Sequence, residues 1–394
     1  MKLTAQIRLL PNPEQASALL LTLERGNEAC NLVSEYAFDH KTFSTFDLQK
    51  VLYHSIKADF GLSAQFVIRC LAKVSGSYKT VKAQIRNHNA TCKPEKKREL
   101  TQISFRPTGA IAFDSRILSF KTDKKTVSIW TVEGRQTVSY SVSDHHQALL
   151  TYQQGESDLA LVKGKWYLFA TCEVPEPDGH ETIDALGVDL GIVQIATDSD
   201  GHSFSGASIE ANRQWYQKRR SALQSVGTKS AKRRLKKLSK GQQRFQKNTN
   251  HTISKSIVMK AAGTRSVIVL EDLSGISKNV SKDEKRLRHS QRAKHSNWGF
   301  FELRSYISYK AQIHGVPVIM VDPRYTSRTC HKCGHCEKAN RKSQAEFVCR
   351  SCQNSMGADQ NAALNIKALG QHQMAYGVGS SLSGTSPQAL AGGI

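Results

Sequence analysis

Two Cys-x-x-Cys pairs near the end of the sequence constrain the fold more than any other feature. They are Cys330 with Cys333 and Cys349 with Cys352. This spacing is typical of a ribbon in which four thiolates surround one structural Zn²⁺ ion. A set of unrelated core cysteines would not explain two such pairs. We therefore predict that these four residues bind one zinc ion and leave no open coordination position.

Three further potential ligands lie in the same segment: His331, His335 and Cys336. Cys336 extends the first pair to Cys-x-x-Cys-x-x-Cys, which leaves a change of register open. Gly334 directly follows Cys333 and suits the tight turn of a zinc knuckle. The sequence therefore favours Cys330 and Cys333 as the first half of the site.

The charge of the chain indicates a polyanionic partner. The 394 residues include 56 Lys and Arg against 33 Asp and Glu, a formal net charge of +23. Nucleic acid, held by many phosphate contacts, is the simplest partner for such an excess. An anionic membrane surface is the alternative, but the basic stretches lack the bulky apolar face that membrane binding needs. No apolar run reaches the ~18 residues of a transmembrane helix.

The cysteine distribution favours a reducing compartment. Five of the nine cysteines fall between residues 330 and 352, and the others are scattered. An odd number concentrated in one place predicts a metal site, not a disulfide framework. The N-terminal run 16–23 is too short for a membrane span and reads as the interior of a helix, not as a signal peptide.

The first half of the chain predicts a strand, a set of helices and then short strands. Residues 1–10 alternate as a strand does, and Asn12, Pro13 and Gln15 form the signature of a capped helix start. Helical patterning continues to about residue 90. Residues 66–86 are apolar on one face and basic on the other, as an ordinary solvated helix or a nucleic-acid face would be. Residues 101–175 predict a small antiparallel barrel that includes a hairpin at Lys163-Gly164.

The second half predicts a mixed α/β sheet. Residues 183–206 read as three strands separated by turns, and a long basic helical region follows. The strand 266–273, an amphipathic helix over 296–315, the strand 316–323 and a helix over 358–369 come next, with the cysteine segment before the last helix. Strands and helices that alternate after an antiparallel start are typical of a mixed α/β sheet.

Three carboxylates lie at the edges of these predicted sheet elements. Asp189 follows a strand in the sequence GVDLG, Glu271 ends the apolar run VIVLE, and Asp359 precedes an Ala-rich helix. Residues Ala362, Ala363, Ile366 and Leu369 follow Asp359 at helical spacing, so its side chain belongs to the face that packs on the sheet. A buried acid is costly unless it is paired or bound to a metal.

Together these acids suit hydrolysis of a phosphodiester with two divalent ions. Carboxylate oxygens bind hard cations such as Mg²⁺. Two ions ~4 Å apart activate water and stabilise the leaving oxygen. Asp272 is a rival for Glu271, but strand alternation points it to the opposite face, where we expect it to cap a turn.

The basic stretches predict phosphate contacts. No Asp or Glu falls between Arg213 and Lys247, whereas a merely solvated helix would mix charges to gain i,i+4 pairs. The predicted contacts within this region are Arg219, Arg220, Lys232, Arg233, Arg234, Lys236 and Lys237. The run 231–237 resembles a nuclear localisation signal, but it is part of a longer helical pattern. A second basic run, residues 282–295, is predicted to form a loop over the same groove.

These motifs resemble the TnpB family, the OrfB-type proteins of bacterial and archaeal insertion sequences. The matching stretches are GVDLGI (187–192), VIVLEDLSGI (267–276), residues 297–334 and ADQNAALNI (358–366). They cover the chain densely from about residue 185 to 370. The N-terminal part matches only in style, through RLLPNPEQ.

The resemblance implies a multidomain α/β protein with an RNase H-like RuvC nuclease domain interrupted by a zinc ribbon. The implied division is a wedge-like β-barrel domain (1–10 and 100–180), a helical recognition domain (11–99), a RuvC-like nuclease domain (181–324 and 356–370), a zinc-ribbon domain that loads target nucleic acid (325–355) and a disordered tail (371–394).

The resemblance also implies an activity. Members are RNA-guided DNA endonucleases that cut double-stranded DNA beside a short target-adjacent motif. It implies that Asp189, Glu271 and Asp359 are the catalytic acids and hold two Mg²⁺ ions, that the four cysteines hold one Zn²⁺, and that Arg328 helps to place a DNA strand. The implied partner is a guide RNA from the end of the element, bound by one protein copy in the prokaryotic cytoplasm near the nucleoid.

Three alternatives stay open at this point. A CRISPR-associated effector of the same fold would carry the same residues, and only the genomic neighbourhood would separate the two. Some relatives have lost their nuclease acids and act as RNA-guided repressors, whereas the three acids are intact here. A role as a transposition accessory protein has no separate tyrosine or serine recombinase motif to support it.

Overall fold

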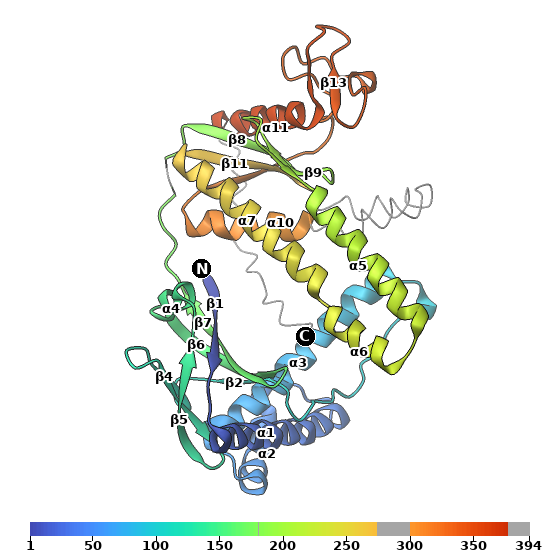
Figure 1. Cartoon of the computed structure of the whole chain (residues 1–394). Coiled ribbons are helices and arrows are strands. Elements are labelled where there is room, and N and C mark those ends of the chain that lie inside the picture. Colours follow the sequence, from blue (N-terminus) through green and yellow to red (C-terminus); the bar gives the residue numbers. More distant parts are fainter. Residues whose placement is uncertain (180, 274–299, 377–394) are drawn as a thin grey trace. The chain divides into compact units, whose positions relative to one another are not determined.

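The computed structural model describes residues 1–179, 181–273 and 300–376 (Figure 1). These residues divide into two compact units, 1–175 and 176–376. Within the described residues no helix combines the length and the hydrophobicity that crossing a membrane requires. Each unit has its own hydrophobic core, and each is described separately below.

The first unit combines an antiparallel sheet with three long helices. Its elements, in chain order, are β1 (Lys2–Leu9), α1 (Pro13–Asp39), α2 (Thr45–Phe60), α3 (Ala64–Thr91), η1 (Pro94–Lys96), β2 (Ile111–Phe113), β3 (Leu118–Lys121), β4 (Thr126–Thr131), β5 (Gly134–Ser141), α4 (Asp144–Leu150), β6 (Gln153–Val162) and β7 (Lys165–Glu173). The strands pair in the order β2-β6-β7-β1-β5-β4-β3. The N-terminal strand therefore lies in the middle of the barrel-like sheet predicted from the later residues.

Local sequence signals in this unit are confirmed. The Asn12 side chain accepts a hydrogen bond from the Gln15 backbone N–H at 2.7 Å, and the Gln15 side chain accepts one from the Asn12 backbone N–H at 3.1 Å. This is the predicted capping box of α1, with Pro13 as first helical residue. The β6–β7 hairpin turns at Lys163 and Gly164, which both have positive φ, as a tight two-residue turn requires.

The second unit is built on a five-stranded mixed sheet. Its elements are β8 (Asp184–Asp189), β9 (Gln194–Asp198), β10 (Ser203–Ser205), α5 (Ala207–Val226), α6 (Lys229–Leu238), α7 (Gly241–Gly263), β11 (Ser266–Glu271), α10 (Phe300–Ile313), β12 (Val318–Val321), η3 (Lys338–Asn340), β13 (Glu346–Val348), β14 (Ser355–Gly357) and α11 (Ala358–Ala375). The strand order is β10-β9-β8-β11-β12. The first three strands run antiparallel, whereas β8, β11 and β12 are parallel to one another.

Strand alternation assigns the two faces of this sheet to different helices. Leu186 and Val188 of β8 point to the core formed with α7 and α10. Ala185 of β8 and Val269 of β11 point to the other face, where Ile366 of α11 packs. Figure 1 shows the sheet between α11 on one side and the α7–α10 pair on the other. The alternating pattern predicts the mixed sheet, and the structure adds that helices cover both of its faces.

Glycines allow α11 to approach this sheet closely. A Cβ added at Gly187 of β8 would overlap the carbonyl oxygen of Ala363 and lie 2.5 Å from the backbone nitrogen of Lys367. A Cβ added at Gly370 would overlap the side chain of Val269 on β11. The backbones of α11 and β8 are therefore in contact, without side chains between them.

Two expectations for α11 are wrong. Leu369 was expected on the buried face, but it is 41 % exposed, and Gly370 takes that place three turns after Asp359. The predicted disordered tail 371–394 begins too early, because α11 continues to Ala375 and Gln371 donates to Asp184 at 2.9 Å. The rest of that segment, from residue 377, lies outside the described residues.

We predict that Gly187→Ala destabilises the second unit by about 2–3 kcal/mol or more, because two backbones must move apart to admit one methyl group. Denaturant unfolding followed by circular dichroism would measure the change. Gly263→Ala is the matched control, since a Cβ at Gly263 of α7 meets nothing within 4 Å and should stabilise the helix by up to about 1 kcal/mol. Equal midpoints for the two variants would contradict the close contact.

Candidate functional site

Asp189 and Glu271 lie at the same edge of the sheet. The parallel register of β8 and β11 pairs Val188 with Leu270, and each acid is the next residue of its strand. Because the carboxyl ends of neighbouring parallel strands meet at one edge, the two acids are neighbours across the ladder. This is the position where open α/β sheets commonly bind ligands.

Alternation sends both side chains to the face that α11 covers. Asp189 follows Ala185 and Gly187 on that face, and Glu271 follows Val269. Asp359 lies in the first turn of α11, close enough to Asp189 for its charge to raise the pKa of that acid. Asp272 points to the other face, as predicted, and forms an ion pair with Arg304 of α10 at 3.2 Å. The structure thus brings the three predicted acids together.

Burial makes all three acids hard to ionise, and for Asp189 the charges of the other two acids add to this effect. Desolvation, followed by the charges of Glu271 and Asp359, raises the pKa of Asp189 from 3.8 to about 7. Desolvation also raises the pKa of Glu271 and of Asp359. A cluster whose charges oppose one another favours a cation between them.

The three carboxylates are less tightly grouped than the four cysteines. Among the described residues, only the four cysteines form a group of three or more potential ligands whose binding atoms all lie within 4.8 Å of one another. Wider spacing is compatible with two ions ~4 Å apart, each bound by part of the set.

Two residues that contact the acids were missed from the sequence. The Nη2 atom of Arg341, in the cysteine segment, lies 3.3 Å from Oδ1 of Asp359, and its charge offsets part of the rise in the pKa of both Asp359 and Asp189. The hydroxyl of Thr326 lies 2.5 Å from Oε1 of Glu271. Both contacts join residues far apart in sequence, so no local pattern pointed to them.

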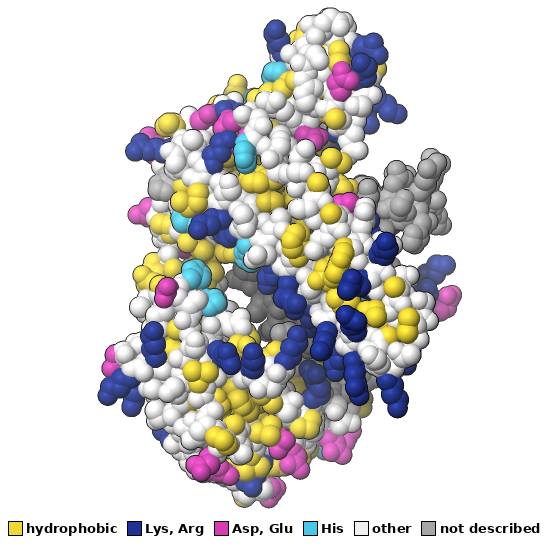
Figure 2. Space-filling view, viewed as in Figure 1, with side chains coloured by type: hydrophobic (Ala, Val, Ile, Leu, Met, Phe, Trp, Pro, Cys, Tyr) yellow, Lys and Arg dark blue, Asp and Glu magenta, His cyan; other side chains and the backbone are white. Residues whose placement is uncertain are grey.

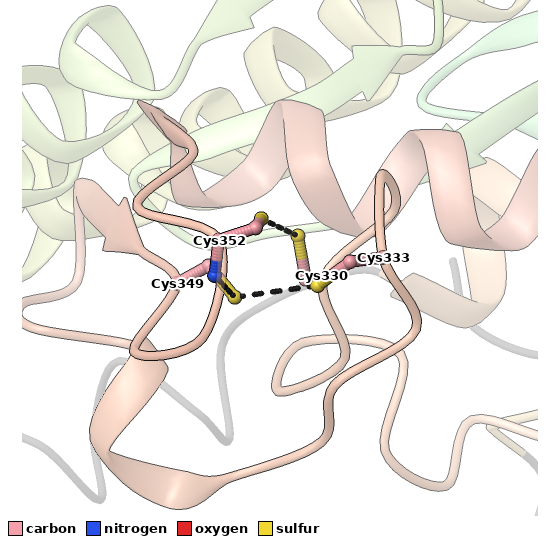
Figure 3. Close-up of side chains that lie close together, drawn as sticks. All are labelled: Cys330, Cys333, Cys349 and Cys352. Carbon is pink, nitrogen blue, oxygen red and sulfur yellow. Dashed lines mark hydrogen bonds between the residues drawn. The ribbon is translucent and has the colours of Figure 1, made fainter.

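The four predicted cysteines converge on one point (Figure 3). The Sγ atoms of Cys330 and Cys352 are 3.7 Å apart, and those of Cys333 and Cys349 are 3.6 Å apart. Four sulfurs at ~2.3 Å from a tetrahedral Zn²⁺ ion lie roughly 3.8 Å from one another. The distances are far too long for disulfides and fit a four-thiolate zinc site.

Each cysteine pair lies on a similar turn. In the first turn the N–H of Gly334 donates to the carbonyl of Cys330 at 2.9 Å, and in the second the N–H of Gln353 donates to that of Cys349 at 3.1 Å. Gly334 and Gln353 both have positive φ. In the second turn the N–H of Cys352 donates to the Cys349 sulfur at 3.5 Å and is the main group that lowers the pKa of that thiol, whereas the pKa of the Cys352 thiol is raised.

The spare ligands are not part of this group. Cys336 is exposed and lies outside the four-sulfur cluster. His331 contacts Asn361 through Nδ1 at 3.3 Å, and His335 contacts Glu337 through Nε2 at 3.2 Å. The four-sulfur cluster therefore uses Cys330 and Cys333 as its first pair, as predicted from Gly334.

The predicted basic region forms α5, α6 and the start of α7. All seven predicted phosphate contacts are exposed: Arg219, Arg220, Lys232, Arg233, Arg234, Lys236 and Lys237. None of them forms an ion pair with another described residue. Figure 2 shows Lys and Arg side chains gathered over these helices. Trp215 is 48 % exposed, and the Arg219 guanidinium lies 5.0 Å from its ring.

Two further predicted contacts stay untested. Arg328 is exposed, and its carbonyl accepts a hydrogen bond from Asn340 at 3.0 Å. Nothing in the structure assigns its side chain to a nucleic acid. The basic run 282–295 lies outside the described residues.

Two family models match adjacent parts of the chain. The model described as OrfB_IS605, probable transposase, matches residues 169–274, which contain Asp189 and Glu271. The model described as Cas12f1-like, TNB domain, matches residues 300–366, which contain the four cysteines and Asp359. Together they include every predicted acid and zinc ligand.

Curated relatives carry related names. CRISPR-associated endodeoxyribonuclease Cas12f1 of Syntrophomonas palmitatica is 31 % identical over 53 % of this chain and 44 % of its own length. Putative RNA-guided DNA endonuclease InsQ of Escherichia coli K12 is 31 % identical over 54 % of this chain and 56 % of its own. The chain thus spans about half the length of the curated relatives it matches.

A solved structure supports the fold. The mini-RNA-guided endonuclease CRISPR-Cas_phi3 aligns with a TM-score of 0.59 at 12 % identity, over 94 % of this chain and 92 % of that chain. At this identity the likeness concerns the fold alone. The resemblance predicted from the motifs is confirmed: residues 169–274 and 300–366 match the OrfB-type and Cas12f1-like family models, and this part of the chain is similar to proteins named Cas12f1 and RNA-guided DNA endonuclease InsQ.

Proposed function

We propose that this chain is an RNA-guided DNA endonuclease of an insertion sequence, which cuts double-stranded DNA beside a short target-adjacent motif. The observation that carries the proposal is the convergence of Asp189, Glu271 and Asp359 at one edge of the mixed sheet. The printed names of the relatives, RNA-guided DNA endonuclease and endodeoxyribonuclease, support the same activity.

The second unit supports a RuvC-like nuclease domain of RNase H type. Three antiparallel strands are followed by two parallel strands, in the order β10-β9-β8-β11-β12. The acids come from the central strand β8, its parallel neighbour β11 and the last helix. We extend this to the domain division predicted from the sequence: a wedge-like domain (1–10 and 100–180), a recognition domain (11–99), the nuclease domain (181–324 and 356–370) and the zinc ribbon (325–355).

The donor set fits Mg²⁺. The three acids offer only oxygen ligands, which is what this ion prefers, and burial, the main cause of their raised pKa values, makes their negative charge costly without a bound cation. Two Mg²⁺ ions, when bound, would activate the attacking water and stabilise the leaving oxygen. The proposed role of the three carboxylates is to hold these ions at the end of β8, where a phosphodiester can reach them.

The remaining groups suit a polyanionic substrate. Arg341 brings a guanidinium to the acids and is suited to contact a phosphate there. The exposed cations of α5 and α6 lack described acidic partners and are suited to hold the backbone of a guide RNA or of its duplex with the target. The four cysteines would hold one structural Zn²⁺ ion in the loading domain.

A CRISPR-associated effector is the second candidate, because Cas12f1 and InsQ match this chain at the same identity. The two candidates differ in the source of the guide. RNA from the end of the element would support the first, and RNA from a repeat array would support the second.

The deciding experiment is cleavage of a plasmid library with randomised flanks. The full chain would be co-expressed with RNA from the flank of its own locus, reprogrammed to the target, and supplied with Mg²⁺. We expect cuts beside one enriched flank motif, and none with Asp189→Asn. Target binding without cutting would favour an RNA-guided repressor. A stable protein–RNA complex that neither binds nor cuts the target would refute the proposal.

Asp189→Asn should also stabilise the metal-free protein. A native-state pKa of about 7, against 3.8, means that ionisation of Asp189 opposes folding: stability falls as pH rises from about 4 to 7. The penalty is at most about 4 kcal/mol, since one pKa unit is equivalent to about 1.4 kcal/mol. Thermal unfolding in EDTA should show a higher midpoint for the variant at pH 8 and a shrinking difference toward pH 4. A less stable variant at pH 8 would contradict a strained carboxylate.

Zinc content can be tested apart from cleavage. We expect one zinc per wild-type chain by elemental analysis, a marked loss of zinc in Cys333→Ser and full retention in Cys336→Ser. The reason is that Cys333 belongs to the four-sulfur cluster and Cys336 does not. Loss of zinc from the Cys336 variant would instead favour the alternative register. Wild-type zinc in the Cys333 variant would do the same.

A further inference from the structure

Thr326 lies between β12 and the first cysteine turn, and its side chain is directed at an acid of the site. It is 4 % exposed. Its Oγ1 lies 2.5 Å from Oε1 of Glu271 and 3.0 Å from the carbonyl oxygen of Pro323. The hydroxyl has one hydrogen and both neighbours accept, so the shorter contact takes it. A separation of 2.5 Å is typical of a hydroxyl that donates to a carboxylate.

The backbone around Thr326 is held by α11. The Asn365 amide donates to the carbonyls of Thr326 at 2.8 Å and Thr329 at 2.7 Å. The Asn361 amide, fully buried, donates to the carbonyl of Thr329 at 2.8 Å, and its oxygen accepts the N–H of His331 at 3.1 Å. The segment 326–331 is therefore fixed at both ends.

The turn inside this segment is tight. The backbone N–H groups of Arg328 and Thr329 both donate to the carbonyl of Tyr325, at 2.9 and 3.0 Å. Tyr325 has φ 66°, which a non-glycine residue adopts only when its surroundings impose it. Cys330, a cysteine of the four-sulfur cluster, follows directly. Thr326, whose hydroxyl donates to Glu271, and the turn at Cys330 thus belong to one short, rigid segment.

We propose that Thr326 is a positioning residue for Glu271. We also propose that the hydrogen bonds from Asn361 and Asn365 to the backbone of residues 326–331 couple this acid to the zinc turn at Cys330. The inference rests on the proposed function. It adds one positioning residue to the same site and a structural connection between the cysteine turn and Glu271. Helix α11 carries Asp359 in its first turn and both asparagines further along. One helix therefore supplies one acid directly and orients another through Thr326.

The expected effect is on cation affinity. A glutamate has three side-chain torsions, and fixing its carboxylate before the metal arrives reduces the cost of ordering it on binding. Partners that hydrogen-bond to metal ligands commonly change affinity by ~10–100-fold. Removal of the Thr326 hydroxyl should therefore weaken cation binding within that range and leave target binding unchanged.

The test compares Thr326→Val, which keeps the shape but lacks the hydroxyl, with Thr326→Ser, which keeps the hydroxyl. Mn²⁺ affinity of the purified full chain, measured by electron paramagnetic resonance, is a readout independent of cleavage. We expect Thr326→Val to weaken Mn²⁺ binding about tenfold or more and to raise the Mg²⁺ concentration for half-maximal cleavage, and Thr326→Ser to keep the wild-type values of both. Equal behaviour of the Thr326→Val and Thr326→Ser variants would overturn the proposal.

Two more variants test the link to zinc. Asn365→Ala leaves the hydroxyl in place but releases the segment, so Mn²⁺ affinity should fall partway; Cys333→Ser should lower it as well. Unchanged affinity in both would overturn the coupling. A purely structural role predicts a lower unfolding midpoint with unchanged metal dependence. Failure of the wild type to cleave DNA would refute the proposed function, while the Mn²⁺ comparison would still decide the role of Thr326.

Discussion

The site depends on one backbone contact, that between α11 and β8 at Gly187. Because glycine has no side chain, the helix lies directly on the strand near Ala363 and Lys367. An ion pair between Lys367 and Asp184, at 2.7 Å, joins the helix to the start of the same strand. Strand alternation then turns Asp189, two residues beyond Gly187, toward the first turn of the helix. The distance between Asp189 and Asp359, two acids that lie far apart in the sequence, thus depends on the absence of a side chain at Gly187.

This arrangement stores electrostatic strain in a protein that is basic elsewhere. Desolvation and the neighbouring acids hold Asp189 at a pKa of about 7, while the chain as a whole carries a net charge of +23. The basic helices can attract a polyanion over distances of the Debye length, but the acids would repel the same phosphates at contact. Cations at the acids remove this conflict. Arg341 offsets part of it in the metal-free protein.

The sequence was informative where one short stretch decides the outcome. The capping box at Asn12, the hairpin at Lys163 and the paired cysteines each depend on neighbours in the chain, and all are confirmed. The acids were found because each ends a strand or begins a helix. Thr326 and Arg341 could not be predicted from the sequence, because their partners Glu271 and Asp359 are 55 and 18 residues away. These residues become neighbours only after the sheet and the ribbon have formed. Leu369 was misassigned because helical spacing is compatible with either residue 369 or 370, and the close contact with Val269 admits only the glycine.

The cysteine segment between β12 and α11, the proposed zinc ribbon, is connected to the acids by more than its two ends. A segment joined to the sheet only by its ends would move independently of the acids. Here Asn361 and Asn365 bind the backbone before the first cysteine turn, and Arg341 reaches back from the ribbon to Asp359. Each contact is made by a group that is buried or half-buried. Breaking it therefore leaves polar atoms without a hydrogen-bond partner, which costs free energy. Movement of the ribbon would therefore be transmitted to Glu271 and Asp359, and a substrate bound by the ribbon would affect the acids that are proposed to cut it.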